Sequence, residues 1–160
     1  DLPAAMLATK AGFGWVHVPY KGSPPLLQDL LAGRIDAGFT GFSNALPHHA
    51  AGKLRIVGVG AGARIKSIPN VPTFKELGLQ DIGAEYVMML SAPAGTPREV
   101  VNLLAATARA VLQEKEFQEK SMEPQGLEAM GLNPAESVSY LSADRPAQRE
   151  RIRVSGAKLD

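Results

Sequence analysis

The chain has no cysteine at all, and only 6% of its 160 residues are aromatic. Without cysteine it can form no disulfide, no Cys-ligated zinc or iron–sulfur site, and no thiol nucleophile. So few aromatic side chains leave little surface on which nucleic-acid bases could stack. These two absences exclude several common classes of redox, metal and nucleic-acid-binding protein.

Neither sign of charge dominates the sequence. It has 17 Lys and Arg against 16 Asp and Glu, for a net charge of +1. The densest basic stretch, residues 145–153, is interrupted by Glu150. A nucleic-acid surface needs a continuous basic stripe that displaces counterions from phosphates, so we expect no nucleic-acid partner.

Long hydrophobic runs are also missing, since no apolar stretch approaches the roughly 20 residues that span a bilayer. No signal peptide is recognisable. The sequence opens with Asp1 rather than Met, and residues 2–8 already have the character of a helix interior. We therefore expect this sequence to lack its natural N-terminal part.

The residues that are present are those of an ordinary folded protein, with 45% hydrophobic and 21% charged residues. Helical and strand patterns alternate over residues 1–60 with short connections. The expected helices are 2–11, a segment capped by Ser23, and a segment capped by Ser43 or Asn44; the expected strands are 15–18, 35–39 and 54–59. Such alternation predicts an α/β fold with a mainly parallel sheet.

The second half of the sequence is more helical. We expect a strand at 84–90, a clear helix that begins after a Thr96 cap with Pro97 as its first residue, and a short helix at 115–122. A small strand or turn near 127–130 should precede the terminal helix, which Pro146 should kink or split.

No constellation of catalytic residues stands out, so we expect no enzyme, cofactor or metal site. His48 and His49 are adjacent, and adjacent helical residues point about 100° apart, which prevents them from chelating one ion well. The run 58–62 (GVGAG) follows a strand, but no helix starts on its third glycine. The dinucleotide-binding pattern requires that helix, so turn glycines are the better interpretation.

Two strand-to-helix turns are better candidates for binding. Residues 19–23 and 40–44 are short and polar, and each leads into a helix N-terminus, where unpaired N–H groups favour an anion such as a carboxylate. Lys21 adds a full positive charge. The alternative is that Ser23 and Ser43 only cap their helices, and that Lys21 is a solvated loop lysine.

Several sequence blocks resemble a known family in their order. They are 18–25 (VPYKGSPP) with 29–36 (DLLAGRID), 43–47 (SNALP) with 51–55 (AGKLR), 68–73 (IPNVPT) with 76–78 (ELG), 92–97 (APAGTP), and the terminal 156–160 (GAKLD). Together they resemble the C-terminal half of the Bug-type solute receptors, the extracytoplasmic binding proteins of tripartite tricarboxylate transporters.

The resemblance implies a periplasmic-binding-protein-like Venus flytrap fold of type II, here only partly represented. Residues 1–83 would form an N-terminally incomplete lobe two, and residues 84–160 the crossover strand and the C-terminal part of lobe one. It also implies a periplasmic location, a small organic acid or amino-acid-like anion as ligand, and permease subunits in the membrane as partners. A half-length chain would expose apolar faces unless another chain or a swapped copy covers them, as in a homodimer.

For the ligand site we predict donors at Thr40, Gly41, Ser43 and Asn44, with Tyr20 and Lys21 as further candidates. Tyr86 would line the hinge side of the cleft, unless it packs in the core. The family often has an aspartate where this chain has Thr40 and Gly41, so the ligand class stays open. Two alternatives remain: the effector lobe of a transcriptional regulator, and a truncated or domain-swapped fragment that binds nothing.

Overall fold

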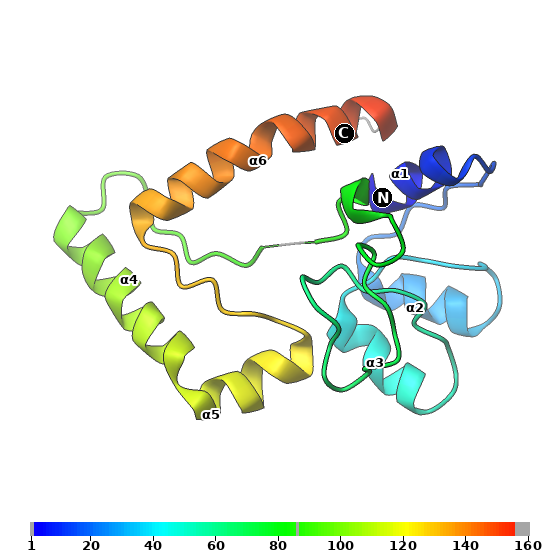
Figure 1. The fold of residues 1–160 in the computed structure, drawn as a ribbon, viewed down its shortest axis with the longest axis horizontal. Coiled ribbons are helices and arrows are strands. Elements are labelled where there is room, and N and C mark those ends of the chain that lie inside the picture. Colours follow the sequence, from blue (N-terminus) through cyan, green and yellow to red (C-terminus); the bar gives the residue numbers. More distant parts are fainter. Residues whose placement is uncertain (1, 86, 156–160) are drawn as a thin grey trace. The chain divides into compact units, whose positions relative to one another are not determined.

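The computed structural model describes residues 2–85 and 87–155. These residues fall into two compact units (Figure 1). The first unit consists of residues 1–85 together with 150–160, and the second consists of residues 86–149. Each unit has its own helices, and the candidate site residues that the structure describes all lie in the first unit.

The first unit contains three α-helices and one 3₁₀ turn among its described residues before position 86. They are α1 (Leu2–Ala11), α2 (Ser23–Leu31), α3 (Phe42–Ala50) and η1 (Gln80–Ile82). Gly12 follows α1 with φ of 68°, a left-handed conformation that a glycine adopts without strain. The three helices predicted for residues 1–60 are therefore confirmed.

The helix starts differ from the predicted caps. Gly22 precedes α2 and Gly41 precedes α3, and neither helix has a hydrogen bond from a capping side chain. Ser23 is the first residue inside α2, and Ser43 and Asn44 lie within the first turn of α3. The capping role predicted for these side chains is therefore wrong, because the helices begin one to three residues earlier than expected.

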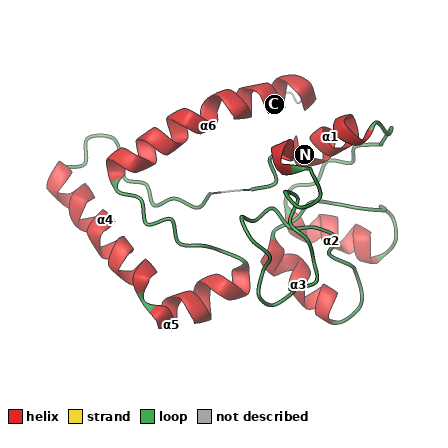
Figure 2. Ribbon diagram, viewed as in Figure 1, coloured by secondary structure: helices red, strands yellow, loops and turns green. Residues whose placement is uncertain are grey.

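The predicted strands do not pair into a sheet within the described residues. Segments 15–18, 35–39, 54–58, 87–90 and 127–130 have no strand assignment, and Figure 2 draws them as loops. One isolated parallel bridge joins Val59 to Thr73. A strand exists only by pairing, and the apolar side chains suited to a sheet interior stay exposed here, with Val16 at 87% and Val57 at 71%.

The core of the first unit packs against the N-terminal part of α3. Val59, Ile68 and Val71 form its buried cluster, and Phe42 and Leu46 of α3 pack against it. Thr73, only 3% exposed, faces Val59 across the bridge, where the Val59 N–H donates to the Pro72 carbonyl and the Phe74 N–H donates to the Val59 carbonyl. This packing fixes the first turn of α3 in place.

The second unit is built from helices along its described residues. They are α4 (Arg98–Gln113), α5 (Lys115–Phe117), η2 (Gln118–Met122), η3 (Glu123–Gln125) and most of α6 (Pro134–Ser155). Pro97 precedes α4 rather than opening it, and the Thr96 hydroxyl donates to the Pro93 carbonyl instead of capping the helix.

Two further features of the second unit bear on the predictions. The helix α6 runs unbroken through Pro146, so the predicted split is wrong; Pro146 is exposed, and water can satisfy the carbonyl that loses its partner there. The helix α4 buries no residue, and Leu103 on it is 67% exposed. No helix among the described residues combines the length and apolar character that a bilayer span requires.

Candidate functional site

The start of α3 brings together four of the predicted site residues. The Gly41 carbonyl accepts hydrogen bonds from the Asn44 N–H at 3.0 Å and the Ala45 N–H at 3.3 Å. The N–H groups of Phe42 and Ser43 come before these bonds and have no partner within the helix. They present donors and a partial positive charge, which suits a carboxylate oxygen.

Thr40 adds a hydroxyl group just before this helix start. Its Oγ1 is buried and has no hydrogen-bond partner, and it is the only such side-chain atom found among the described residues. A buried polar group without a partner is destabilising and rare in folded proteins. The hydrogen-bonding capacity of the Thr40 hydroxyl is therefore unused within the described part of the chain.

Ser43 and Asn44 are both exposed at the first turn of α3. The Asn44 side chain folds back over Gly41: a β-carbon at position 41 would lie 3.1 Å from the Asn44 Nδ2 atom. The lack of a side chain at Gly41 therefore gives the Asn44 amide its place. Thr40, Gly41, Ser43 and Asn44 lie together at the start of α3, and we call these four residues the α3 cradle.

The start of α2 offers fewer backbone N–H donors than the start of α3. Its second and third residues are Pro24 and Pro25, which have no N–H group. An anion at this end would therefore find few backbone donors. Lys21, which is exposed, supplies the positive charge there.

Tyr20 has a partner within the chain. Its hydroxyl donates to the Asp29 Oδ2 atom at 2.8 Å, and Arg34 Nη1 donates to the other carboxylate oxygen at 2.8 Å. The single hydroxyl proton is used in this bond and cannot be offered to a ligand at the same time. Sequence reasoning missed Asp29 and Arg34 as functional candidates, although both lie in the block 29–36 that carries the family resemblance.

The three side chains also shift each other's protonation. The hydrogen bonds from Arg34 and Tyr20 lower the pKa of the Asp29 carboxyl. Desolvation and the bond to Asp29 raise the pKa of the Tyr20 hydroxyl, and the bond to Asp29 raises that of the Arg34 guanidinium. The carboxylate, the neutral phenol and the guanidinium are therefore the states that this cluster favours.

The remaining predicted residues have plainer outcomes. Tyr86 lies outside the described residues. His49 accepts a hydrogen bond at Nδ1 from the Ile56 N–H at 3.2 Å, a role within the fold. In the described part of the chain no group of three His, Asp or Glu side chains is arranged to hold a metal ion.

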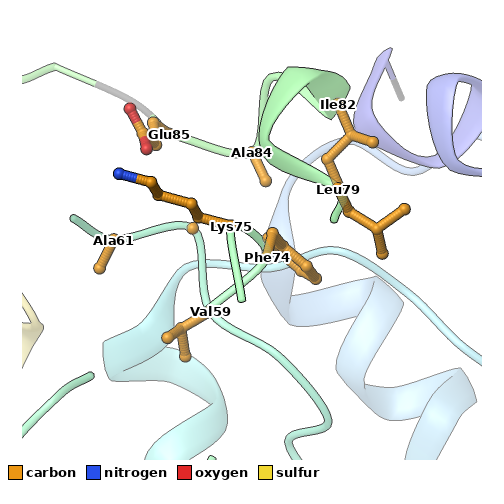
Figure 3. A pocket seen from close by; sticks show the side chains of 9 residues that line it. Val59, Ala61, Phe74, Lys75, Leu79, Ile82, Ala84 and Glu85 are labelled. Atoms are coloured by element: carbon orange, nitrogen blue, oxygen red, sulfur yellow. The ribbon is translucent and has the colours of Figure 1, made fainter. Parts of the chain in front are cut away.

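A separate hollow lies in the first unit. Residues 59–61 line one side and Phe74, Lys75, Leu79, Ile82, Ala84 and Glu85 complete it. Figure 3 shows the Lys75 and Glu85 side chains reaching toward the same end. Tyr20, Lys21 and the α3 cradle do not line this hollow, so it is a different feature from the predicted site.

Comparison with known proteins identifies the family. The family model described as the tripartite tricarboxylate transporter family receptor matches residues 1–154. The chain belongs to this family of receptors, which confirms the resemblance to Bug-type proteins.

The relatives also define the fold. A UPF0065 protein in the tcbD-tcbE intergenic region of Pseudomonas sp. (strain P51) is 33% identical over 144 residues, covering 89% of this chain and 41% of the relative. The structure of R. palustris Rpa4515 with adipate matches with a TM-score of 0.84 and 29% identity, over 97% of this chain and 52% of that one. The structure of the periplasmic binding protein BugD matches with a TM-score of 0.73 and 25% identity, over 99% of this chain and 54% of that one.

The chain thus spans about half the length of these relatives. Its fold is part of the periplasmic-binding-protein-like α/β fold, as the resemblance implied.

Proposed function

We propose that the chain is the ligand-binding part of a periplasmic solute receptor, which captures a small organic acid at the α3 cradle for a tripartite transporter. The observation that carries the proposal is the buried Thr40 hydroxyl without a partner. It stands beside the N–H groups at the start of α3 that have no partner within the helix, so this end of the helix offers several donors to a ligand. A carboxylate, which only accepts hydrogen bonds, suits these donors.

The relatives support the same ligand class. The solved structure of Rpa4515 is one with adipate, a dicarboxylate, and BugD is a periplasmic binding protein. We further propose that residues 1–83 form lobe two and residues 84–160 the returning part of lobe one. The membrane permease subunits would then receive the acid from the assembled receptor.

Calorimetry with a panel of small acids tests the proposal. The panel contains adipate, a shorter dicarboxylate, a monocarboxylate and the uncharged diamide of adipate. We expect binding of at least one carboxylate, no binding of the diamide, and weaker binding by the Thr40→Val variant. Failure of every carboxylate to bind would overturn the proposal.

Native mass spectrometry of the same sample tests whether a second copy of the chain completes the ligand site. A dimer, or a retained organic acid, would support a ligand site that a second copy completes. We expect such completion because α4 leaves its apolar side uncovered. A ligand-free monomer that also fails the calorimetric panel would favour the alternative of a fragment without receptor function.

A further inference from the structure

We propose that Asp29 is a positioning residue, which holds Lys21 in place as the cationic contact for the acid by clamping Tyr20 and Arg34. The inference rests on the proposed function and adds a second anchoring point to the α3 cradle. It assigns a role to two residues, Asp29 and Arg34, that do not belong to the predicted site.

The geometry is a clamp across the length of α2. Tyr20 lies before the helix, Arg34 lies beyond its end, and Asp29 is inside it. One carboxylate oxygen of Asp29 accepts the Tyr20 hydroxyl and the other accepts Arg34 Nη1, both at 2.8 Å. The backbone adds a further bond, from the Arg34 N–H to the Asp29 carbonyl at 2.9 Å.

The start of α2 needs such a clamp because its local structure provides no other one. No side chain caps the helix, and Gly22 has φ of 97°, a conformation that residues with a side chain rarely adopt. Pro24 and Pro25 hold the helix side rigid. The Tyr20–Asp29 hydrogen bond restrains the other side, so Lys21 and Gly22 are held between two fixed points.

Lys21 is suited to a ligand in charge and in access. It is exposed, and it forms no ion pair with a carboxylate in the part of the chain that the structure describes. Since the prolines remove backbone donors from this helix start, its ammonium is the natural partner for an anion there.

A double-mutant cycle in the full 160-residue chain tests the inference, with adipate as the probe. Lys21→Gln and Tyr20→Phe should each weaken adipate binding about two- to fivefold, as expected for an exposed charge contact. If Tyr20 acts through Lys21, then Tyr20→Phe should have no further effect in the Lys21→Gln background. Asp29→Ala should weaken adipate binding relative to the unmodified chain. Asp29→Glu, which keeps the negative charge, should weaken it less.

Two control variants test whether the effects depend on where the substitutions are made. Tyr140→Phe and Lys53→Gln make the same chemical changes at sites outside the clamp and should leave affinity unchanged. Hydrogen exchange at the Lys21 and Gly22 amides should speed up in Tyr20→Phe but not in Tyr140→Phe.

The outcomes distinguish this inference from the proposed function. If the unmodified chain binds no carboxylate, both fail. If it binds adipate but Lys21→Gln has no effect, or the effects of Tyr20→Phe and Lys21→Gln are fully additive, the clamp is structural only and this inference alone is overturned.

Discussion

Gly60 lies directly against the backbone of Ala84. A β-carbon at position 60 would come within 2.5 Å of the Ala84 carbonyl oxygen and 2.7 Å of its carbonyl carbon. Sequence reasoning interprets the glycines of 58–62 as flexible turn residues, but Gly60 is instead required for the close approach of two segments. Backbone atoms cannot swing aside as a long side chain can.

Gly60→Ala should therefore destabilise the chain. We expect the free energy of unfolding in urea to fall by about 1–3 kcal/mol, the usual cost of forcing extra volume into a tight contact. Gly14→Ala is the control, because a β-carbon there meets no heavy atom within 4 Å, and it should change stability by less than about 0.5 kcal/mol. Equal effects of the two variants would show that the contact between Gly60 and Ala84 is not tight in solution.

Thr40→Val should separate stability from binding. Replacing a buried hydroxyl that has no partner by a methyl group of similar shape should raise the free energy of unfolding by about 1 kcal/mol. The same variant should bind the carboxylate more weakly, because the donor is lost. Thr107→Val, whose hydroxyl donates to the Leu103 carbonyl on exposed α4, serves as the control for both measurements. A loss of stability in Thr40→Val would mean that the hydroxyl has a partner within the protein.

Ser43→Ala should affect binding only. Ser43 is exposed and caps nothing, so the thermal midpoint should stay close to that of the unmodified chain. Carboxylate affinity should fall by about three- to tenfold, the value of one hydrogen bond. Ser139→Ala, in α6, provides the comparison. Unchanged affinity in calorimetry would remove Ser43 from the α3 cradle.

Glu76 should make stability depend on pH. Its carboxylate accepts Arg64 Nε at 3.0 Å and the Thr73 N–H at 2.7 Å, and these bonds lower the pKa of Glu76 below its ordinary value of 4.5. A lowered pKa in the folded state adds stability that is present above pH 4.5 and is lost as the pH falls through the folded-state value.

The measurement is the thermal midpoint of Glu76→Gln and of the unmodified chain at several pH values. The unmodified chain should be the more stable at neutral pH, and the difference should shrink as the pH drops below 4.5. Glu128→Gln, in an exposed loop, should show no such trend. A difference that stays constant with pH would mean that the charge of Glu76 contributes nothing to stability.

Local patterns in the sequence were enough to predict the helices. The apolar spacing of Leu26, Leu27 and Leu30 is typical of a helix, and Gly33 follows shortly after α2 ends at Leu31. The caps failed because Gly22 and Gly41 take the turn positions, leaving Ser23 and Ser43 inside the helices. The strands failed for a different reason: a strand depends on a neighbouring segment, and residues such as Val57 have none among the described residues.

The candidate site was predictable only where it is continuous in sequence. Residues 40–44 are neighbours along the chain, so their convergence follows from the helix start alone. The bond from Tyr20 to Asp29 spans nine positions and depends on how the chain enters α2. The lack of backbone N–H donors at the start of α2 could nevertheless be predicted from Pro24 and Pro25, since proline carries no N–H group.

Because of those two prolines, the two ends of the proposed site should respond differently to salt. In the proposed site, directed N–H groups would hold an anion at the start of α3, whereas the charge of Lys21 would hold an anion near α2. Dissolved ions screen exposed charges over about 8 Å at physiological ionic strength. A molecule with two acidic ends would therefore loosen first at the lysine end as the salt concentration rises, while its other end stays bound at the α3 cradle.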